Sequence, residues 1–160
     1  MSMTANAVGK SLSEAERAYL TGLLDADSAI MAVIERHSEK RHGFRIRVVW
    51  KITQRDDHIL NALQKEWDLG QMRKNRDAYD WRIRDQKQVG EMLTMLAPYV
   101  RVKSRQIALA REILQTERIS MRGLMRAAKL ADTLSSFNVR SNGRRKNYSA
   151  MIQESLSCND

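Results

Sequence analysis

The chain has 160 residues, enough for one domain with a substantial buried core. Its 28 lysines and arginines outnumber its 19 acidic residues and give a formal net charge of +9, which favours a polyanionic partner, either nucleic acid or an anionic membrane. Cys158 is the single cysteine, which excludes an internal disulfide and a multi-cysteine zinc site, and no apolar run approaches the roughly 20 residues needed to cross a bilayer.

The first predicted element is a helix that begins near Ser13, after a polar tail of residues 1–10. Ser13 and Glu16 have the spacing of a capping box, which is typical of a helix start. Ala18 and Gly22 lie four residues apart and therefore share one face of this helix. Small residues on one face allow another helix to approach closely, so this face is predicted to be a helix–helix interface.

A period of two residues follows Ser28, and the clearest strand covers residues 44–54. Its apolar face consists of Phe44, Ile46, Val48, Trp50 and Ile52, and its other face of Arg45, Arg47, Val49, Lys51 and Thr53. This pattern predicts a sheet that covers the core on one side and meets an anionic partner on the other.

The remaining elements alternate in type. A helix is predicted after Asp56 or Asp57 and ends by Gly70, and strands are predicted at about 71–76 and 79–85. Further helices are predicted before Pro98 and at about 104–114, 122–134 and 149–156. The order helix, strand, strand, helix, strand, strand, helix, with further helices at the C-terminus, predicts an α+β fold.

Residues 20–28, with the sequence LTGLLDADS, closely resemble the motif that names the LAGLIDADG homing endonucleases. Thr21 and Ser28 are the two non-conservative departures, and Ser28 replaces a glycine whose backbone freedom serine lacks. Residues 52–54 (ITQ) and Val102-Lys103 with Gln106 are similar to segments of the single-motif, homodimeric members from group I introns of algal organelles.

The resemblance implies an αββαββα core with a curved antiparallel DNA-binding sheet and extra C-terminal helices. We expect residues 1–160 to form one such domain, with a flexible tail at 1–10, the core at about 11–115, and C-terminal helices and a basic loop at about 118–160. The single cysteine predicts a reducing compartment. The resemblance implies an intracellular location, in a chloroplast, a mitochondrion or a prokaryotic cytoplasm, and no membrane partner.

Catalytic roles also follow from the resemblance. Asp27 and the carbonyl of Ala26 would bind a divalent metal, Gln54 would orient the attacking water, and Lys103 would offset charge on the phosphate. The expected cofactor is Mg²⁺, with Mn²⁺ able to substitute and Ca²⁺ supporting binding without cleavage. Oxygen ligands of this kind suit hard cations.

One motif in one chain implies a homodimer, because cutting both strands of double-stranded DNA needs two active sites. A symmetric dimer implies a long pseudo-palindromic target. The interface is placed at Ala18, Thr21, Gly22 and Asp25. The residues placed on DNA are His37, Lys40, Arg45, Arg47, Lys51, Arg73, Asn75, Asp80, Arg82 and Arg84, with Arg140, Arg144, Arg145 and Lys146 on phosphates.

Other interpretations stay open. Without the resemblance, Asp25 and Asp27 fit a solvated helix end, and Lys103 fits a surface charge near a helix start. The strand arginines could pair with acidic neighbours, but seven basic residues against one acidic residue between positions 36 and 55 argue against internal pairing. The alternative function is a catalytically silent DNA-binding protein or an intron RNA maturase on the same fold.

Overall fold

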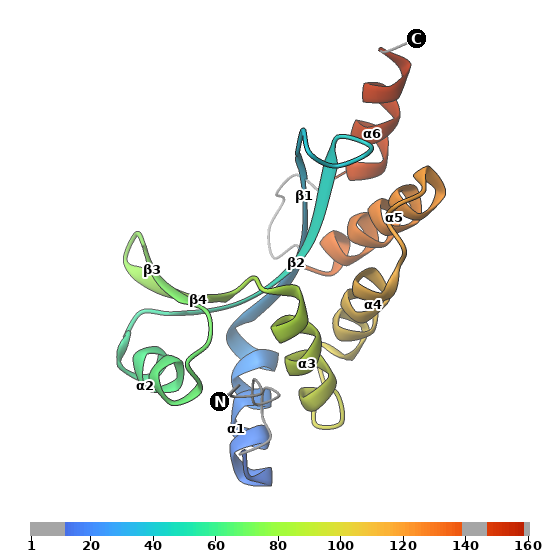
Figure 1. Ribbon diagram of the computed structural model, residues 1–160. Helices are drawn as coiled ribbons and strands as arrows, with labels where there is room; N and C mark the ends of the chain where they lie inside the picture. The colour runs from blue at the N-terminus through green and yellow to red at the C-terminus, as the bar shows by residue number, and fades with distance from the viewer. Residues whose placement is uncertain (1–11, 139–146, 159–160) are drawn as a thin grey trace, which may run out of the picture.

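The structure is a computed structural model that describes residues 12–138 and 147–158. Its elements, in chain order, are α1 (Glu14–Asp27), β1 (Ser28–Arg36), β2 (Phe44–Gln54), α2 (His58–Trp67), β3 (Gln71–Asn75), β4 (Ala78–Ile83), α3 (Gln86–Leu96), α4 (Ser104–Gln115), α5 (Met121–Phe137) and α6 (Tyr148–Ser157) (Figure 1). The predicted α+β order is therefore confirmed. The basic loop residues Arg140, Arg144, Arg145 and Lys146 lie outside the described residues.

The four strands form one antiparallel sheet in the order β1-β2-β4-β3. Residues 44–52 of β2 pair with β1, whereas β4 pairs only with residues 50–54 of β2. The β1–β2 and β3–β4 hairpins therefore diverge from a shared centre (Figure 1). One consequence is that, among the described residues, no strand pairs with residues 44–49 of β2 on the β4 side.

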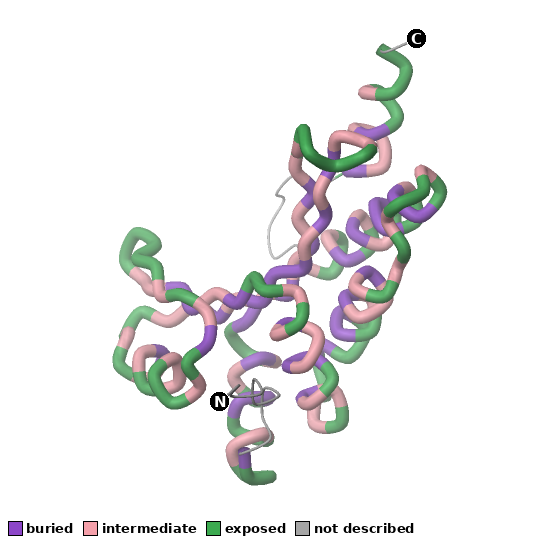
Figure 2. The backbone as a smooth tube through the Cα atoms, viewed as in Figure 1, coloured by how far each residue is buried: buried purple, intermediate pink, exposed green. Residues whose placement is uncertain are grey.

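The core lies between the sheet and the helices. α3, α4 and α5 pack on the β1–β2 part of the sheet, and α2 packs against β3 and β4 (Figure 1). All five residues of the predicted apolar face of β2 are buried, and Figure 2 shows buried segments where helices meet the sheet. Trp50 and Trp81 are 1% exposed, with ring centroids 5.4 Å apart, so the predicted position of Trp50 on the core face of residues 44–54 is confirmed.

The ends of α1 follow from the sequence. Glu16 N–H donates to Ser13 Oγ at 3.2 Å and the Glu16 carboxylate accepts from Ser13 N–H at 2.6 Å, which confirms the capping box. At the other end, Ser28 has φ −96° and ψ 160°, an extended conformation that any residue adopts. The departure from glycine at Ser28 therefore costs no backbone strain, and its hydroxyl donates to the Leu24 carbonyl at 2.6 Å.

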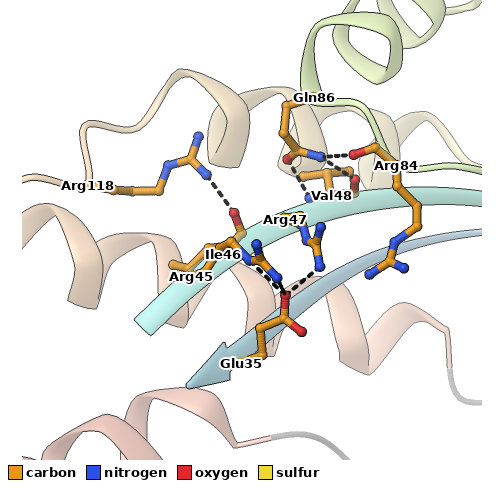
Figure 3. A network of polar contacts seen from close by, with 8 residues as sticks. All are labelled: Glu35, Arg45, Ile46, Arg47, Val48, Arg84, Gln86 and Arg118. Carbon is orange, nitrogen blue, oxygen red and sulfur yellow. Dashed lines mark hydrogen bonds and ion pairs between the residues drawn. The ribbon is translucent and has the colours of Figure 1, made fainter. Parts of the chain in front are cut away.

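Side chains from the helical layer complete the open edge of β2. Gln86, the first residue of α3, accepts from Val48 N–H at 2.8 Å and donates to Val48 C=O at 2.9 Å (Figure 3). Arg118, between α4 and α5, donates to Ile46 C=O at 2.9 Å (Figure 3). Such edge groups otherwise attract another strand, so these contacts protect the edge and join it to α3 and α4.

No helix within residues 12–138 and 147–158 is both long enough and apolar enough to cross a membrane.

Candidate active site and nucleic-acid interface

The end of α1 brings together residues from distant parts of the chain. Ser28 pairs with Ile52 in the β1–β2 ladder, which places the end of β2 beside the end of α1. Gln54 Nε2 consequently donates to Asp27 Oδ2 at 2.7 Å. The Asp27 side chain is exposed, so one of its oxygens is oriented by Gln54 while the carboxylate stays accessible to a ligand.

The carboxylate of Asp25, two residues earlier, accepts hydrogen bonds from another segment of the same chain. Its carboxylate accepts the backbone N–H groups of Arg101, Val102 and Lys103 at 2.9, 3.2 and 3.0 Å. Partial burial raises the pKa of Asp25, but these three N–H groups outweigh burial and leave the pKa below its usual value. Asp25 therefore anchors the segment before α4 to the end of α1, rather than offering its oxygens to a metal.

That segment carries Lys103, which is only 7% exposed. Its Nζ donates to the carbonyl oxygens of Leu24 at 2.7 Å and Asp25 at 2.6 Å. A cation is favoured at a helix C-terminus, where carbonyl groups lack partners and the helix dipole is negative. The interpretation of Lys103 as a surface charge is therefore wrong, because its ammonium group is built into the same helix end as Asp27.

This helix end presents two hard oxygen donors to a divalent metal: the exposed Asp27 carboxylate and the backbone carbonyl of Ala26. Among the described residues, no group of three or more His, Cys, Asp and Glu side chains could hold a metal ion. The donor set of one chain thus fits a Mg²⁺ ion that takes its other ligands from water, a phosphate or a second chain, as Mg²⁺ commonly does.

The basic face of the sheet contains internal ion pairs. The carboxylate of Glu35 binds Arg45 and Arg47, and the hydrogen bond from Arg45 is the main cause of a pKa below the usual value (Figure 3). Lys51 and Arg82 lie 3.6 and 2.6 Å from the carboxylate of Asp80. The expectation that these basic residues stay unpaired within the chain is wrong for these four, because β-pairing places acidic residues of neighbouring strands beside Arg45, Arg47 and Lys51, and Arg82 lies two residues from Asp80 on the same face of β4.

Asp80 was placed among the DNA contacts, but its side chain is fully buried in the sheet. It accepts hydrogen bonds from Thr53 at 2.6 Å, Arg82 at 2.6 Å and Asn75 at 3.1 Å. Burial raises the pKa of Asp80, but these hydrogen bonds and the Lys51 ammonium outweigh it and lower the pKa. The placement of Asp80 on DNA is therefore corrected: the residue orients polar neighbours from β2, β3 and β4.

The other residues placed on DNA lie on the two hairpins. Arg73 and Arg84 are exposed on β3 and after β4, and Lys40 is exposed in the turn between β1 and β2, where His37 is half-buried. Together with the paired basic residues of β2 and β4, they give the sheet a long cationic surface.

An exposed stripe runs along α1, on the side away from the core residues Leu20 and Leu24. It consists of Ala15, Ala18, Tyr19, Gly22 and Ala26, and Tyr19 is 50% exposed. A Cβ atom built on Gly22 would meet nothing within 4 Å. The spacing of three and four residues could have revealed Ala15, Tyr19 and Ala26 in the sequence.

Thr21 does not belong to this α1 stripe. Its side chain is 2% exposed and its hydroxyl donates to Arg17 C=O at 2.6 Å. The interface assignment of Thr21 is therefore corrected, because a side chain buried in its own chain cannot contact a partner. The carboxylate of Asp25 is likewise bound by backbone N–H groups of the segment before α4, in its own chain.

Comparisons with known proteins give matches in both sequence and fold. A family model described as LAGLIDADG endonuclease matches residues 20–114. The DNA endonuclease I-CreI of Chlamydomonas reinhardtii is 25% identical over 99 residues. That match spans 61% of this chain and 61% of the length of the curated relative.

Solved structures of the homing endonuclease I-CvuI are similar over most of the chain. One, in complex with its target in the presence of Ca, has a TM-score of 0.79 and 26% identity, covering 90% of this chain and 94% of the other. Another, in complex with the I-CreI target in the presence of Mg and with the DNA not cleaved, has a TM-score of 0.78 and 25% identity, with the same coverage. The shared fold thus extends over 90% of this chain.

Proposed function

The chain belongs to the LAGLIDADG endonuclease family, and we propose that it is a site-specific, Mg²⁺-dependent homing endonuclease that cuts both strands of double-stranded DNA as a homodimer. The observation that carries this proposal is the exposed Asp27 carboxylate, which Gln54 orients at the end of α1 beside a cationic sheet. A protein that only binds DNA gains nothing from a carboxylate held among phosphates, because the two repel each other.

The chemistry follows from the residues at the helix end. Asp27 and the Ala26 carbonyl would hold the divalent cation, which, when bound, stabilises negative charge on the reacting phosphate. Gln54 keeps the Asp27 carboxylate in one orientation, and its amide would direct a water molecule next to that carboxylate. Lys103 supplies fixed positive charge at this end of the helix and holds the segment of residues 101–103 against it.

The homodimer rests on the α1 stripe. Its small residues allow two copies of α1 to pack closely across a two-fold axis, and close packing would bring the two Asp27 residues near each other, one for each DNA strand. The two sheets would then form one continuous cationic surface. Strands can enter the major groove and read base edges there, so the target is a long pseudo-palindrome.

The experiment incubates purified protein with a randomised duplex library and with the DNA flanking its own gene, in Mg²⁺, in Ca²⁺ and in chelator. We expect Mg²⁺-dependent cutting at one pseudo-palindromic sequence, and Ca²⁺-supported binding without cutting. Asp27→Asn should bind the same sequence without cutting it. Asp68→Asn is the matched control, because it makes the same chemical change at an exposed left-handed position that asparagine tolerates.

Two outcomes would contradict the proposal. Cutting by Asp27→Asn at the wild-type rate would remove Asp27 from the metal site. Specific binding without cutting in any metal would remove the nuclease activity and leave the catalytically silent DNA-binding protein or the intron RNA maturase.

A further inference from the structure

The β1–β2 hairpin extends beyond the rest of the sheet. Among the described residues, only β1 pairs with residues 44–49 of β2, because β4 begins its pairing at residue 50. A hairpin of two strands is marginally stable by itself and needs packing from other elements. In Figure 1 this hairpin projects away from α1, with α4 and α5 beside it. The position of its turn, residues 37–43, therefore depends on contacts with the helical layer.

The turn is closed by hydrogen bonds within its own backbone. His37 N–H donates to Gly43 C=O at 2.8 Å, Lys40 N–H donates to His37 C=O at 3.1 Å, and Gly43 N–H donates to Lys40 C=O at 2.8 Å. Gly43 has φ +73°, a left-handed conformation that glycine adopts without steric cost. Residues 37–43 consequently move as one unit, and the exposed side chain of Lys40 moves with them.

His42 joins this turn to the loop between α4 and α5. Its Nε2 lies 2.8 Å from the backbone carbonyl oxygen of Ile119, a residue 77 positions away in the chain. Because a carbonyl oxygen only accepts hydrogen bonds, Nε2 carries the hydrogen and donates it. Arg118, the neighbouring loop residue, donates to Ile46 C=O at 2.9 Å. The α4–α5 loop thus holds the hairpin both at its turn and at the start of β2.

The loop that presents the Ile119 carbonyl is itself held in place. The Glu117 carboxylate accepts the N–H groups of Ile119 and Ser120 and, at 2.7 Å, the Ser120 hydroxyl. The hydrogen bonds from Ser120 lower the pKa of Glu117, which favours the ionised form that accepts them. A Cβ atom built on Gly123 would collide with the Glu117 carbonyl oxygen, so glycine is needed for the loop to pack on the start of α5. His42 therefore binds a fixed acceptor.

The turn lies far from the catalytic end of the hairpin. β1 begins at Ser28, next to Asp27, and its nine residues place the turn about 30 Å away, at about 3.3 Å per residue. Successive base pairs are about 3.4 Å apart along double-stranded DNA, so this distance corresponds to roughly nine base pairs from the cut. Displacing the turn by about half of one step, roughly 1.7 Å, changes which base edges Lys40 can reach but leaves the residues beside Asp27 in place.

We propose that His42 is a positioning residue for DNA recognition: it fixes the β1–β2 turn on the α4–α5 loop and so sets the base selectivity at the outer end of each half-site. This inference rests on the proposed DNA-cutting function. The His42 side chain is bound to Ile119, so it acts through the residues of the turn and touches no base itself.

The first measurement is backbone amide hydrogen exchange in the free protein. His42→Ala removes the donor, whereas His42→Gln keeps an N–H donor at a similar reach. Ser38→Ala is the control, because it changes an exposed side chain of the same turn. We expect the amides of residues 37, 40 and 43 to exchange about tenfold faster in His42→Ala, and within about threefold of the wild-type rate in the other two variants.

The second measurement selects bound sequences from a randomised duplex library in Ca²⁺, which requires no cutting. A mismatch at a recognised base pair lowers affinity roughly 5-fold to 150-fold. We expect His42→Ala to reduce the preference at the outermost positions of each half-site below about threefold, and to leave the positions near the cut as selective as in the wild type. His42→Gln should restore the outer preference. Glu117→Ala, which loosens the acceptor loop, should reproduce the loss.

Selection of the same outer bases by His42→Ala and the wild type would overturn the inference, as would an equal loss of selectivity at every position. Wild-type exchange of the turn amides in His42→Ala, or a His42→Gln variant that behaves like His42→Ala, would overturn it as well. A wild-type protein without sequence preference would contradict the proposed function and this inference together. A sequence bound selectively in Ca²⁺ but never cut in Mg²⁺ would contradict the endonuclease proposal alone.

Discussion

Replacing Gly22 with leucine separates the stability of one chain from the association of two. Gly22 is an exposed residue inside α1, and a Cβ atom there would meet nothing within 4 Å. A leucine side chain can therefore project into solvent from an isolated chain. Glycine in a helix interior is less favourable than alanine by roughly 0.5–1 kcal/mol, and leucine is nearly as good a helix former as alanine. Gly22→Leu should therefore stabilise the monomer by about 0.5–1 kcal/mol.

The effect on a dimer packed through the α1 stripe has the opposite sign. Extra side-chain atoms forced into a close contact cost about 1–3 kcal/mol per site, and a two-fold interface contains the changed residue twice. The free energy of dimer association should therefore become less favourable by about 2–6 kcal/mol. This corresponds to a dissociation constant raised roughly 30-fold to 10⁴-fold.

Sedimentation velocity over a range of protein concentrations would measure dimerisation, and urea unfolding at concentrations where both proteins are monomeric would measure stability. Ala62→Leu, at an exposed position of α2 outside the α1 stripe, is the matched control and should leave the dimer unchanged. A Gly22→Leu variant that dimerises like the wild type would refute the placement of the interface on the α1 stripe. A destabilised monomer would refute the conclusion that Gly22 faces open space.

Two further predictions concern buried charges. Lys103→Met removes the ammonium group from the two carbonyl oxygens that it binds, so we expect the free energy of unfolding in urea to fall by about 2–4 kcal/mol. A fall below about 0.5 kcal/mol would show that water replaces the ammonium there. Asp80→Asn should destabilise the fold at pH 7 and relax base selectivity in a library selection, because Arg82 and Lys51 lose the carboxylate that orients them. The pKa of Asp80 is lower in the folded chain than in the unfolded chain, so its ionised form stabilises the fold above about pH 4 and this stabilisation is lost as the pH falls further. The difference in unfolding free energy between wild type and Asp80→Asn should therefore shrink below about pH 4, and a difference that stays constant down to pH 2 would contradict this role.

The order of elements could be predicted because each depends on local periodicity. The strand from Phe44 to Gln54 was predicted with its observed ends, since alternation of apolar and basic residues is a property of neighbouring residues. The α1 start at Ser13 was equally predictable, because the capping box spans only four residues. Asp27 and Gln54 were named from motif resemblance, and the register of β1 with β2 then placed them in contact.

Three details were decided only by contacts between distant segments. Asp25 and Asp27 are chemically alike in the sequence, but the segment before α4, more than 70 residues later, occupies Asp25 and leaves Asp27 exposed. Lys103 could not be recognised as buried, because its acceptors belong to the end of α1. Asp80 has the alternation of an outward-facing residue, yet side chains of neighbouring strands cover it.

The sequence by itself therefore determined the fold class, the family and the chemical type of the site, because helix and strand periods and a nine-residue motif are local properties of the chain. Only the tertiary structure decided which carboxylate stays accessible and which cations are already neutralised. The physical reason is that burial and hydrogen bonding change the availability of a charged group, and both depend on segments that the folded chain brings together from far apart.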